Sequence, residues 1–424
     1  MNITIIVPSL PYPLNSGGAQ AVFNMIDKTR GKNSITLVCI PSRLTRRRHV
    51  AELKEKWPDV DIVIYPYLRQ LADLWFLKEK AVRALKLLFR KNSRAFVVER
   101  ALKPYGTHFN GRLKRFIDKV VLLSEPDVIQ VEFFPLLPIV GFLPKDVRRV
   151  FVHHELRFVR NERLLRDIDL TDREKMYERG VKGEEIARLN EYDRVVTLTD
   201  TDKHILQENG VTTAISVSPA AIGSPVRPYV KWQNKLLFLG GYGHKPNVEG
   251  LEWFVKSVAP KIAWEKFPNV KFHLVGGGWP DKVTEKYRSE LAIPFIYEGF
   301  VPRLEDVATG SIMVVPILTG SGMRMKILEA SALCIPFITT SVGVEGLGFA
   351  HRDSCIVEDS AELWAASLSE LMASEAMRHR LSEKAQRIFK AEYSVEALAD
   401  RRMEVYQFQS VTPYEKNSGL LRNL

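Results

Sequence analysis

The residues best suited to chemistry form one short stretch, TGSGMRMKILEAS at 319–331. It follows an apolar run, SIMVVPIL, that predicts a buried strand. Glycines let the backbone approach a ligand closely, and a helix that begins beside them offers free N–H groups to an anion. Arg324 and Lys326 add positive charges that suit a phosphate. The turn made by Gly320, Ser321 and Gly322 is thus suited to anion capture.

A helix that starts near Ser321 would bring three useful positions to one face. Residues 322, 326 and 329 would then lie within about 60° of one another at 3.6 residues per turn. Lys326 would pair with a diphosphate, and Glu329 would accept hydrogen bonds from a ribose diol. Lys326 and Glu329 are also spaced like an ordinary i,i+3 surface pair, so that alternative stays open.

Alternating strands and helices must position these residues. Predicted strands of the first half are 2–8, 34–41, 61–66, 127–133, 148–154 and 194–199. Predicted strands of the second half are 235–241, 271–277, 294–300, 311–317, 336–340 and 354–359. A strand, a glycine-bearing loop, a helix and another strand make a βαβ unit of a parallel sheet. We therefore predict an α/β protein with two tandem Rossmann-like, doubly wound domains, at 1–220 and 235–392. The proline-bearing segment 216–235 is the predicted linker, and a helix within about 393–424 is expected to return to the first domain.

Two more glycine clusters stand at predicted strand ends in the second half. They are Gly240-Gly241 and Gly276–Gly278. In open parallel sheets, ligands bind beyond the carboxyl ends of the strands, so these clusters should converge with the 320–322 turn. Neither cluster fits the dinucleotide fingerprint or the P-loop.

Composition indicates a globular protein, with 46% hydrophobic and 26% charged residues among 424. The three cysteines are too scattered for a disulfide framework or a zinc site, and we expect reduced thiols in the core. The N-terminus lacks the pattern of a signal peptide. The longest apolar stretch, at 133–144, holds three prolines and is too short to span a bilayer.

The net charge of +11 is concentrated between Arg43 and Lys119, which hold 20 Lys/Arg against 8 Asp/Glu. Within this part, about 68–120 has helical spacing, with aromatic and leucine residues among the basic ones. Such a segment favours an amphipathic helix on an anionic membrane surface, through 68–119. A basic solvated face over packed helices is the alternative. Nucleic-acid binding is not expected, because no recognition fold is evident.

The chain resembles retaining glycosyltransferases of the GT-B fold, in particular glycosyltransferase family 4. The resemblance rests on an ordered set of motifs: FLGGYGHKPNVEGLEWF (238–254), FHLVGGG (272–278), IYEGFV (296–301) and VVPILTGSGMRMKILEASALCIPFITTSVGVEGL (314–347). It implies two domains facing across a cleft, with a nucleotide-sugar donor bound mainly by the second and the acceptor mainly by the first.

The resemblance also implies roles in the second domain. The second glutamate of the family's Glu-x(7)-Glu signature corresponds to Glu329, and the first, which faces the donor sugar in the family, is replaced by Ser321. The resemblance implies that the backbone amides of Gly320, Ser321, Gly322 and Met323, with the Ser321 hydroxyl, take over that role. Arg324 and Lys326 would take over the diphosphate and carry catalysis. Gly240 and Gly241 would approach the donor, and Phe300 and Val301 would hold its base through backbone groups.

In the first domain, NSGGAQ matches the family's glycine loop, so Gly17 and Gly18 are expected near the phosphates. His154 stands where the family has a histidine facing the donor sugar; a structural histidine is the alternative, and only one of His153 and His154 can reach the cleft. The implied reaction is metal-independent transfer, with retention, to a glycan or lipid-linked acceptor in the cytoplasm or at the inner membrane face. A nucleotide-sugar epimerase and a non-catalytic nucleotide-binding subunit remain alternatives.

Overall fold

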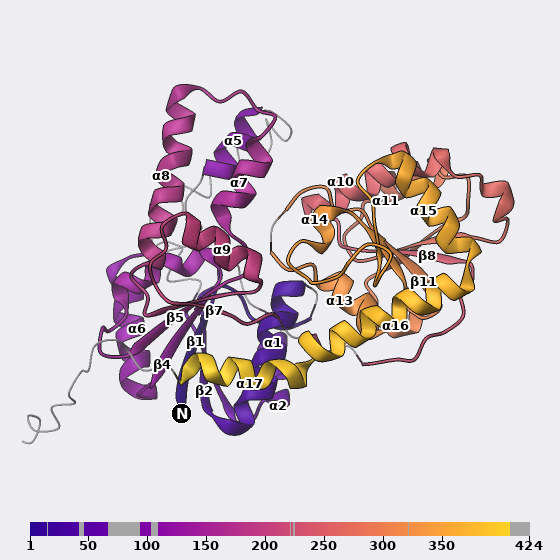
Figure 1. The fold of residues 1–424 in the computed structure, drawn as a ribbon. Coiled ribbons are helices and arrows are strands. Elements are labelled where there is room, and N and C mark those ends of the chain that lie inside the picture. The colour runs from indigo at the N-terminus through magenta and orange to yellow at the C-terminus, as the bar shows by residue number, and fades with distance from the viewer. Residues whose placement is uncertain are drawn as a thin grey trace, which may run out of the picture.

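The protein folds into two parallel-sheet α/β domains, as the computed structural model shows (Figure 1). The structure describes residues 1–14, 16–41, 46–66, 94–102, 109–220, 222–223, 225–320 and 322–407. The predicted fold class is confirmed, because both sheets are parallel and have helices on both faces.

The first sheet has the strand order β3-β2-β1-β4-β5-β6-β7, all parallel. Its strands are β1 (Asn2–Val7), β2 (Ser34–Cys39), β3 (Val60–Ile64), β4 (Val128–Glu132), β5 (Arg148–His153), β6 (Arg194–Thr197) and β7 (Ile215–Val217). Its helices are α1 (Gly17–Thr29), α2 (Arg47–Lys56), α5 (Arg94–Leu102), α6 (Gly111–Ser124), α7 (Arg157–Leu165), α8 (Asp172–Leu189) and α9 (Asp200–Glu208). The apolar stretch near 140 forms a buried 3-10 helix, Phe134–Phe142.

The second sheet has the order β10-β9-β8-β11-β12-β13 and is also parallel. Its strands are β8 (Lys235–Leu239), β9 (Lys271–Val275), β10 (Phe295–Gly299), β11 (Ser311–Val315), β12 (Phe337–Thr339) and β13 (Ile356–Val357). The helices that follow are α10 (Lys245–Trp253), α11 (Asp281–Glu290), α12 (Glu305–Ala308), α13 (Met325–Ala332), α14 (Ser341–Val344), α15 (Ala361–Ala373), α16 (Glu375–Glu392) and α17 (Val395–Tyr406).

Each sheet is apolar on both faces, which is why its strands read as nearly continuous hydrophobic runs. In β11, Ile312 and Val314 pack into the core on one face. Met313 and Val315 pack into the core on the other. Alternate side chains of a strand point to opposite faces, so helices must cover both, as a doubly wound fold requires.

Two sequence predictions about connections need correction. The segment predicted as a linker from 216 begins with β7, which pairs with β6 and extends the first sheet. The predicted helical stretch 68–120 is not one helix in its described part, because Asn110 caps a new helix, α6, by accepting hydrogen bonds from the N–H groups of Arg112 and Leu113. Residues 67–93 and 103–108 of that stretch lie outside the described residues, and most of the predicted membrane-binding segment lies with them.

The described part of the basic segment includes α6, whose apolar side chains Leu113, Ile117 and Val120 are buried in the core. Leu122 and Leu123, at the end of α6, are exposed. Over the described ranges, no helix is long and apolar enough to cross a membrane.

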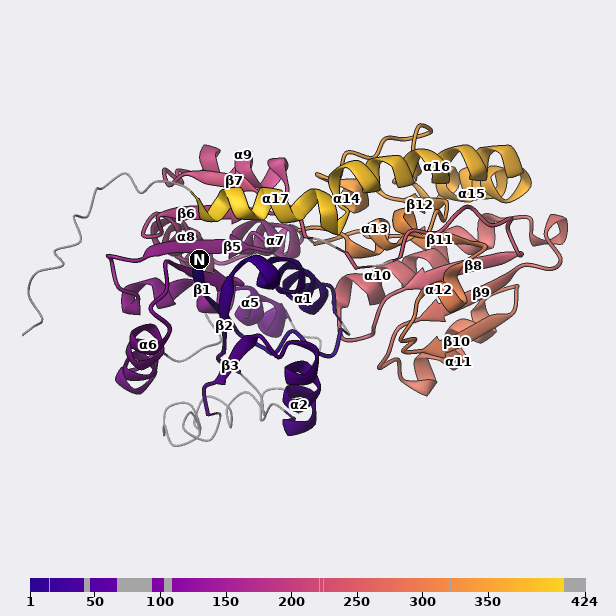
Figure 2. The ribbon, with the colours of Figure 1, turned by 90° about the horizontal axis from the view of Figure 1, so that it is seen from below.

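The C-terminal helix α17 crosses from the second domain to the first and packs against α1 (Figure 2). Its last residue, Tyr406, is fully buried and donates a hydrogen bond to Gln130 on β4. A helix far along the chain thus completes the first domain.

Gly250 on α10 is expected to be essential for packing in the second domain. A Cβ at this position would lie 1.9 Å from the carbonyl oxygen of Pro316, which belongs to the backbone and cannot simply move aside. We expect Gly250→Ala to lower the free energy of unfolding by about 2 kcal/mol, measured by urea denaturation.

Gly183→Ala on α8 is the matched control. A Cβ there would meet no heavy atom within 4 Å, so the substitution should stabilise the helix by roughly 0.5–1 kcal/mol. Equal stability of Gly250→Ala and the wild-type protein would contradict the observed packing.

Candidate functional site

The glycine-rich turn connects β11 to α13, and α13 begins at Met325. Gly320 and Gly322 have φ values of 121° and 80°, in the left-handed region that glycine favours. The chain therefore turns here before a helix can form, and the predicted helix start near Ser321 was wrong. Ser321 itself lies outside the described residues.

Lys326, in the first turn of α13, contacts a polar side chain of α10 and an aromatic side chain of β8. Its Nζ donates to Oδ1 of Asn247 at 2.8 Å and lies 5.0 Å from the centre of the Phe238 ring. Burial lowers the pKa of Lys326 to about 7, and Arg324 lowers it further while Glu329 opposes the shift. The ammonium group is thus poorly solvated and favours a negative partner.

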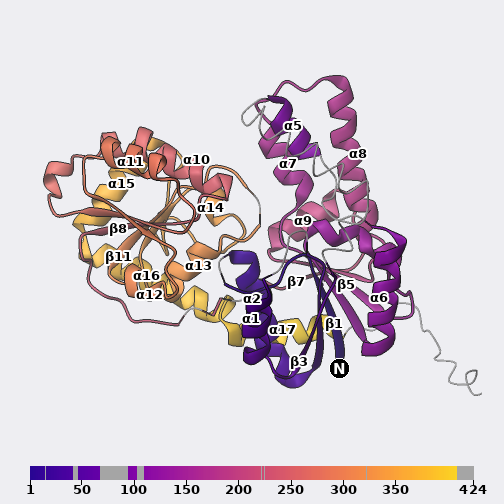
Figure 3. The ribbon, with the colours of Figure 1, turned by 180° about the vertical axis from the view of Figure 1, so that it is seen from behind.

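Glu329, one turn further along α13, is buried at the boundary between the domains, with only 9% of its surface exposed. Burial raises the pKa of Glu329 to about 7, whereas a hydrogen bond from Gln20 and the charge of Lys326 act to lower it. Gln20 belongs to α1 of the first domain, and Figure 3 shows α1 beside α13. The Glu329 carboxylate, which belongs to the second domain, is therefore also contacted by a side chain of the first domain.

The glycines at the end of β8 make room for Asn247. A Cβ on Gly240 would lie 2.5 Å from the Asn247 side chain, and a Cβ on Gly241 would lie 3.2 Å from the Gly277 carbonyl oxygen. Asn247 Nδ2 donates to the Gly241 carbonyl at 2.9 Å. Sequence analysis missed Asn247, although a polar residue in the first turn after a glycine pair was a usable signal.

Exposed aromatic side chains stand beyond the ends of β8 to β10. Phe300 follows β10 and is 56% exposed, next to the half-buried Val301. Tyr242 is also exposed and packs edge-on against Trp279, whose Nε1 donates to the Gly240 carbonyl at 2.8 Å. The predicted roles of Phe300 and Val301 in holding a base stay predictions.

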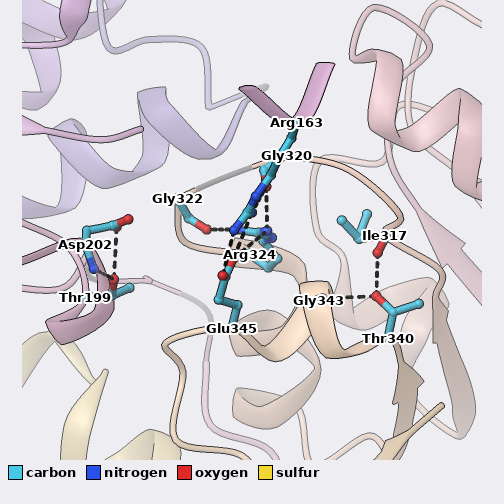
Figure 4. A network of polar contacts seen from close by, with 10 residues as sticks. All are labelled: Arg163, Thr199, Asp202, Ile317, Gly320, Gly322, Arg324, Thr340, Gly343 and Glu345. Carbon is cyan, nitrogen blue, oxygen red and sulfur yellow. Dashed lines mark hydrogen bonds and ion pairs between the residues drawn. The ribbon is translucent and has the colours of Figure 1, made fainter. Parts of the chain in front are cut away.

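Arg324 is buried beneath the turn and binds its carbonyl groups (Figure 4). Its guanidinium donates to the carbonyls of Gly320 and Gly322 and lies 3.8 Å from Oε2 of Glu345. In this arrangement Arg324 shapes the turn, and its predicted contact with a diphosphate stays a prediction.

Arg163 of α7 joins the first domain to the same cluster (Figure 4). Its two terminal guanidinium nitrogens, Nη1 and Nη2, donate to the Glu345 carboxylate at 2.9 and 2.7 Å. Nη1 also donates to the Gly320 carbonyl. Two arginines from different domains thus share one carboxylate. Sequence analysis missed Arg163 and Glu345, which have no local pattern that marks them.

The segment that carries Glu345 is fixed from both sides. Thr340 donates to the Ile317 carbonyl and accepts from the Gly343 N–H at 3.0 Å, which starts α14. A Cβ on Gly346 would lie 2.9 Å from Thr199, the cap of α9 in the first domain. The domains therefore meet here too closely for a side chain at residue 346.

The glycine loop of the first domain lies directly against α13. Ser16 caps α1, and a Cβ on Gly17 would lie 2.8 Å from Met325. A Cβ on Gly18 would lie 3.0 Å from the Phe133 ring. Met323 packs with the cores of both domains. Gly17 of the first domain thus lies against the first residue of α13, three residues after Gly322.

His154 follows β5 and lies at the same boundary. Its Nε2 donates to Oε2 of Glu132 at 2.5 Å, and its ring stacks on Phe133 with a centroid distance of 3.8 Å. A Cβ on Gly322 would lie 2.4 Å from the His154 carbonyl oxygen. His154 therefore lies directly beside the turn of the second domain.

His153 has a different environment, because its side chain is fully buried and bonds to Glu185 at 2.8 Å. Of the two neighbouring histidines, only His154 has a partly exposed side chain, 13% against 0% for His153. Within the described ranges, no cluster of three or more His, Cys, Asp or Glu side chains is arranged to bind a metal ion.

Comparison with known proteins agrees with this arrangement. Residues 233–374, most of the second domain, match the family model described as glycosyl transferases group 1. A Klebsiella pneumoniae protein, described as an uncharacterized 44.6 kDa protein in the cps region, is 26% identical over 137 residues. That match spans 31% of this chain and 35% of the relative, so it covers about a third of either protein.

Solved structures share the fold over nearly the whole chain. A mutant form of S. aureus TarM, in a complex with Fondaparinux, alpha-GlcNAc-glycerol and UDP, has a TM-score of 0.65 at 10% identity, covering 96% of this chain and 100% of that one. Anabaena HepE, in a complex with UDP, has a TM-score of 0.63 at 12% identity, covering 96% and 99%. The two facing parallel-sheet domains define the GT-B fold. Together with the family match on the second domain, this fold supports a GT-B glycosyltransferase.

Proposed function

We propose that this protein transfers a sugar, with retention of configuration, from a nucleoside-diphosphate sugar to a glycan or lipid-linked acceptor. The observation that carries the proposal is that Lys326 and Glu329 lie one turn apart on α13, with Lys326 bonded to Asn247 of the second domain and Glu329 bonded to Gln20 of the first. A poorly solvated ammonium group suits a diphosphate, and a carboxylate suits a ribose diol.

The leaving nucleoside diphosphate gains negative charge as the sugar departs. Cations and N–H donors that are already in place stabilise that charge without reorganising. In the proposed complex, Lys326 faces the diphosphate, the backbone of Gly320 and of Gly322 lies beside the donor sugar, and His154 lies on the other side of the sugar. Asn247 orients Lys326 through its 2.8 Å hydrogen bond.

The first experiment is a thermal-shift screen with UDP, GDP, ADP and their sugars. We expect one base to raise the melting temperature, because a ligand that binds only the folded state stabilises it. The stabilising donor is then incubated with lipid-linked and glycan acceptors, and the product is analysed by mass spectrometry and NMR. A free epimer would favour the epimerase, and binding without turnover in every assay would favour a non-catalytic subunit.

Proton uptake should accompany donor binding if Lys326 faces the diphosphate. The pKa of Lys326 is about 7, so the amine is mostly neutral at pH 8 in the free protein. A bound diphosphate favours the ammonium form and raises this pKa, so the complex should take up about one proton at pH 8. Calorimetry in buffers with different ionisation enthalpies measures this number, and a buffer-independent enthalpy would contradict the assignment.

A further inference from the structure

A chain of buried polar side chains connects the C-terminal helix to His154. Tyr406 donates to Oε1 of Gln130 at 2.8 Å, and Arg402 lies 3.4 Å from the same oxygen. Gln130 Nε2 donates to Oε1 of Glu132, whose Oε2 receives the His154 hydrogen bond. Gln130 and Tyr406 are 0% exposed and Glu132 is 1% exposed. A buried network of this kind has one low-energy arrangement, because each unmade bond is costly.

The direction of each bond follows from the chemistry of the groups. A carboxylate only accepts, so the Gln130 amide must turn its NH₂ toward Glu132 and its oxygen toward α17. Tyr406 and Arg402 are both donors, which matches that oxygen. Burial raises the pKa of Tyr406, so its hydroxyl keeps the proton that it donates. The helix and the carboxylate thus select the same orientation of Gln130.

The same logic fixes the imidazole of His154. Because Nε2 faces a carboxylate, it must carry a proton, and in the neutral ring Nδ1 is then the acceptor. Phe133 holds the ring by stacking at an interplanar angle of 13°. Phe133 itself has a φ of 68°, which is unusual and unfavourable for a bulky residue. Both the tautomer and the plane of the ring are therefore held by neighbouring residues.

We propose that Glu132, Gln130 and helix α17 are positioning residues that hold His154 in one tautomer at the domain boundary. This inference rests on the proposed function, in which His154 faces the donor sugar. It adds that α17, which lies outside the residues matched by the family model, takes part in building the site. Nδ1 of His154 would then accept a hydrogen bond from a hydroxyl group of the donor sugar.

The test is NMR of the full-length protein labelled with ¹⁵N in its histidine rings, at mildly alkaline pH. The nine histidines give separable signals, and loss of a signal in His154→Gln assigns His154. The ring nitrogen shifts report which nitrogen carries the proton. We expect the Nε2–H tautomer of His154 in the wild-type protein, and His153, bonded to Glu185, is an internal reference.

Glu132→Gln should disturb this state. The carboxylate accepts from Gln130 at Oε1 and from His154 at Oε2. In glutamine one of these two oxygens becomes an NH₂ group, which cannot accept, so one of the two bonds is lost. We expect mixed tautomers of His154 and a kcat about tenfold lower, with the donor KM within about twofold. Tyr406→Phe, which removes only a hydroxyl, should shift the His154 signal in the same direction and lower kcat about threefold.

The matched control is Tyr192→Phe. Tyr192 is also a buried tyrosine of the first domain, but it donates to the Leu137 carbonyl at 2.9 Å, away from the chain that ends at His154. In the Tyr192→Phe variant, the His154 signal and kcat should equal those of the wild type. Unchanged tautomers in Glu132→Gln, or an equal effect of Tyr192→Phe, would overturn the proposal. If the wild-type protein transfers no sugar, the proposed function fails, and the NMR result still decides the positioning of His154.

Discussion

Lys326→Ala and Glu329→Ala are each expected to weaken nucleoside-diphosphate binding by about tenfold or more, which is at least 1.4 kcal/mol. The Lys326 ammonium group donates to Asn247, which in turn bonds to the Gly241 carbonyl, and it is poorly solvated. Its loss removes charge-assisted hydrogen bonds to the diphosphate. Glu329 is expected to act on the ribose, so Glu329→Ala should also weaken binding of the nucleoside monophosphate.

Isothermal titration calorimetry with the base identified by thermal shift measures both effects. Lys256→Ala is the control for loss of a positive charge in the same domain. Lys256 pairs with Glu252 in an exposed i,i+4 contact, and such pairs contribute little. If Lys326→Ala and Glu329→Ala both bind the nucleoside diphosphate with wild-type affinity, the assignment of the site is wrong. Weaker binding in Lys256→Ala would indicate a general effect of charge.

The fold was predictable from the sequence because doubly wound domains carry strong local signals. β1 and β11 are apolar on both faces, so they read as short hydrophobic runs followed by glycine and a helical pattern. β7 was missed, because Ile215–Val217 is a short, half-buried edge strand among prolines and its assignment depends on pairing with β6.

The candidate site was predictable only in part, and the reason is distance along the chain. Glycines and charges at strand ends are local features, so Gly320, Lys326 and Glu329 could be selected from the sequence. The groups that contact them come from other elements: Gln20 contacts Glu329, Asn247 contacts Lys326, and Arg163 contacts the Gly320 carbonyl. Such partners depend on how distant elements pack and how the two domains meet, and no periodicity of a single segment contains that information.

The start of α13 shows a similar limit. The sequence places a glycine, a serine and a glycine before Arg324, and helix-dipole reasoning favoured a start at Ser321. The positive φ values of Gly320 and Gly322 instead use the freedom of glycine for a turn. Arg324 then satisfies the carbonyl groups of that turn. The Gly320 and Gly322 pair is thus compatible with a helix start and with a tight turn. The choice of the turn depends on tertiary contacts, those of Gly322 with His154 and of Arg324 with Glu345.

His154→Ala is expected to lower the rate of sugar transfer by about 100-fold while leaving affinity for the nucleoside diphosphate within about twofold of wild type. His154 lies against Gly322 and is held by Glu132 and Phe133, beside the turn where the donor sugar is proposed to lie. A positioned imidazole that acts on the reacting sugar contributes typically 10²–10⁴-fold to the rate and little to binding of the leaving group.

Single-turnover kinetics with the identified donor separates this effect from binding. His379→Ala is the matched control, because His379 is an exposed histidine on α16 that pairs with Glu383 at 3.4 Å, and its loss should change neither rate nor affinity. A fall in diphosphate affinity equal to the fall in rate would show that His154 supports the binding site as a whole. An unchanged rate would instead make His154 a structural residue, which its stacking on Phe133 and its bond to Glu132 could then fully explain.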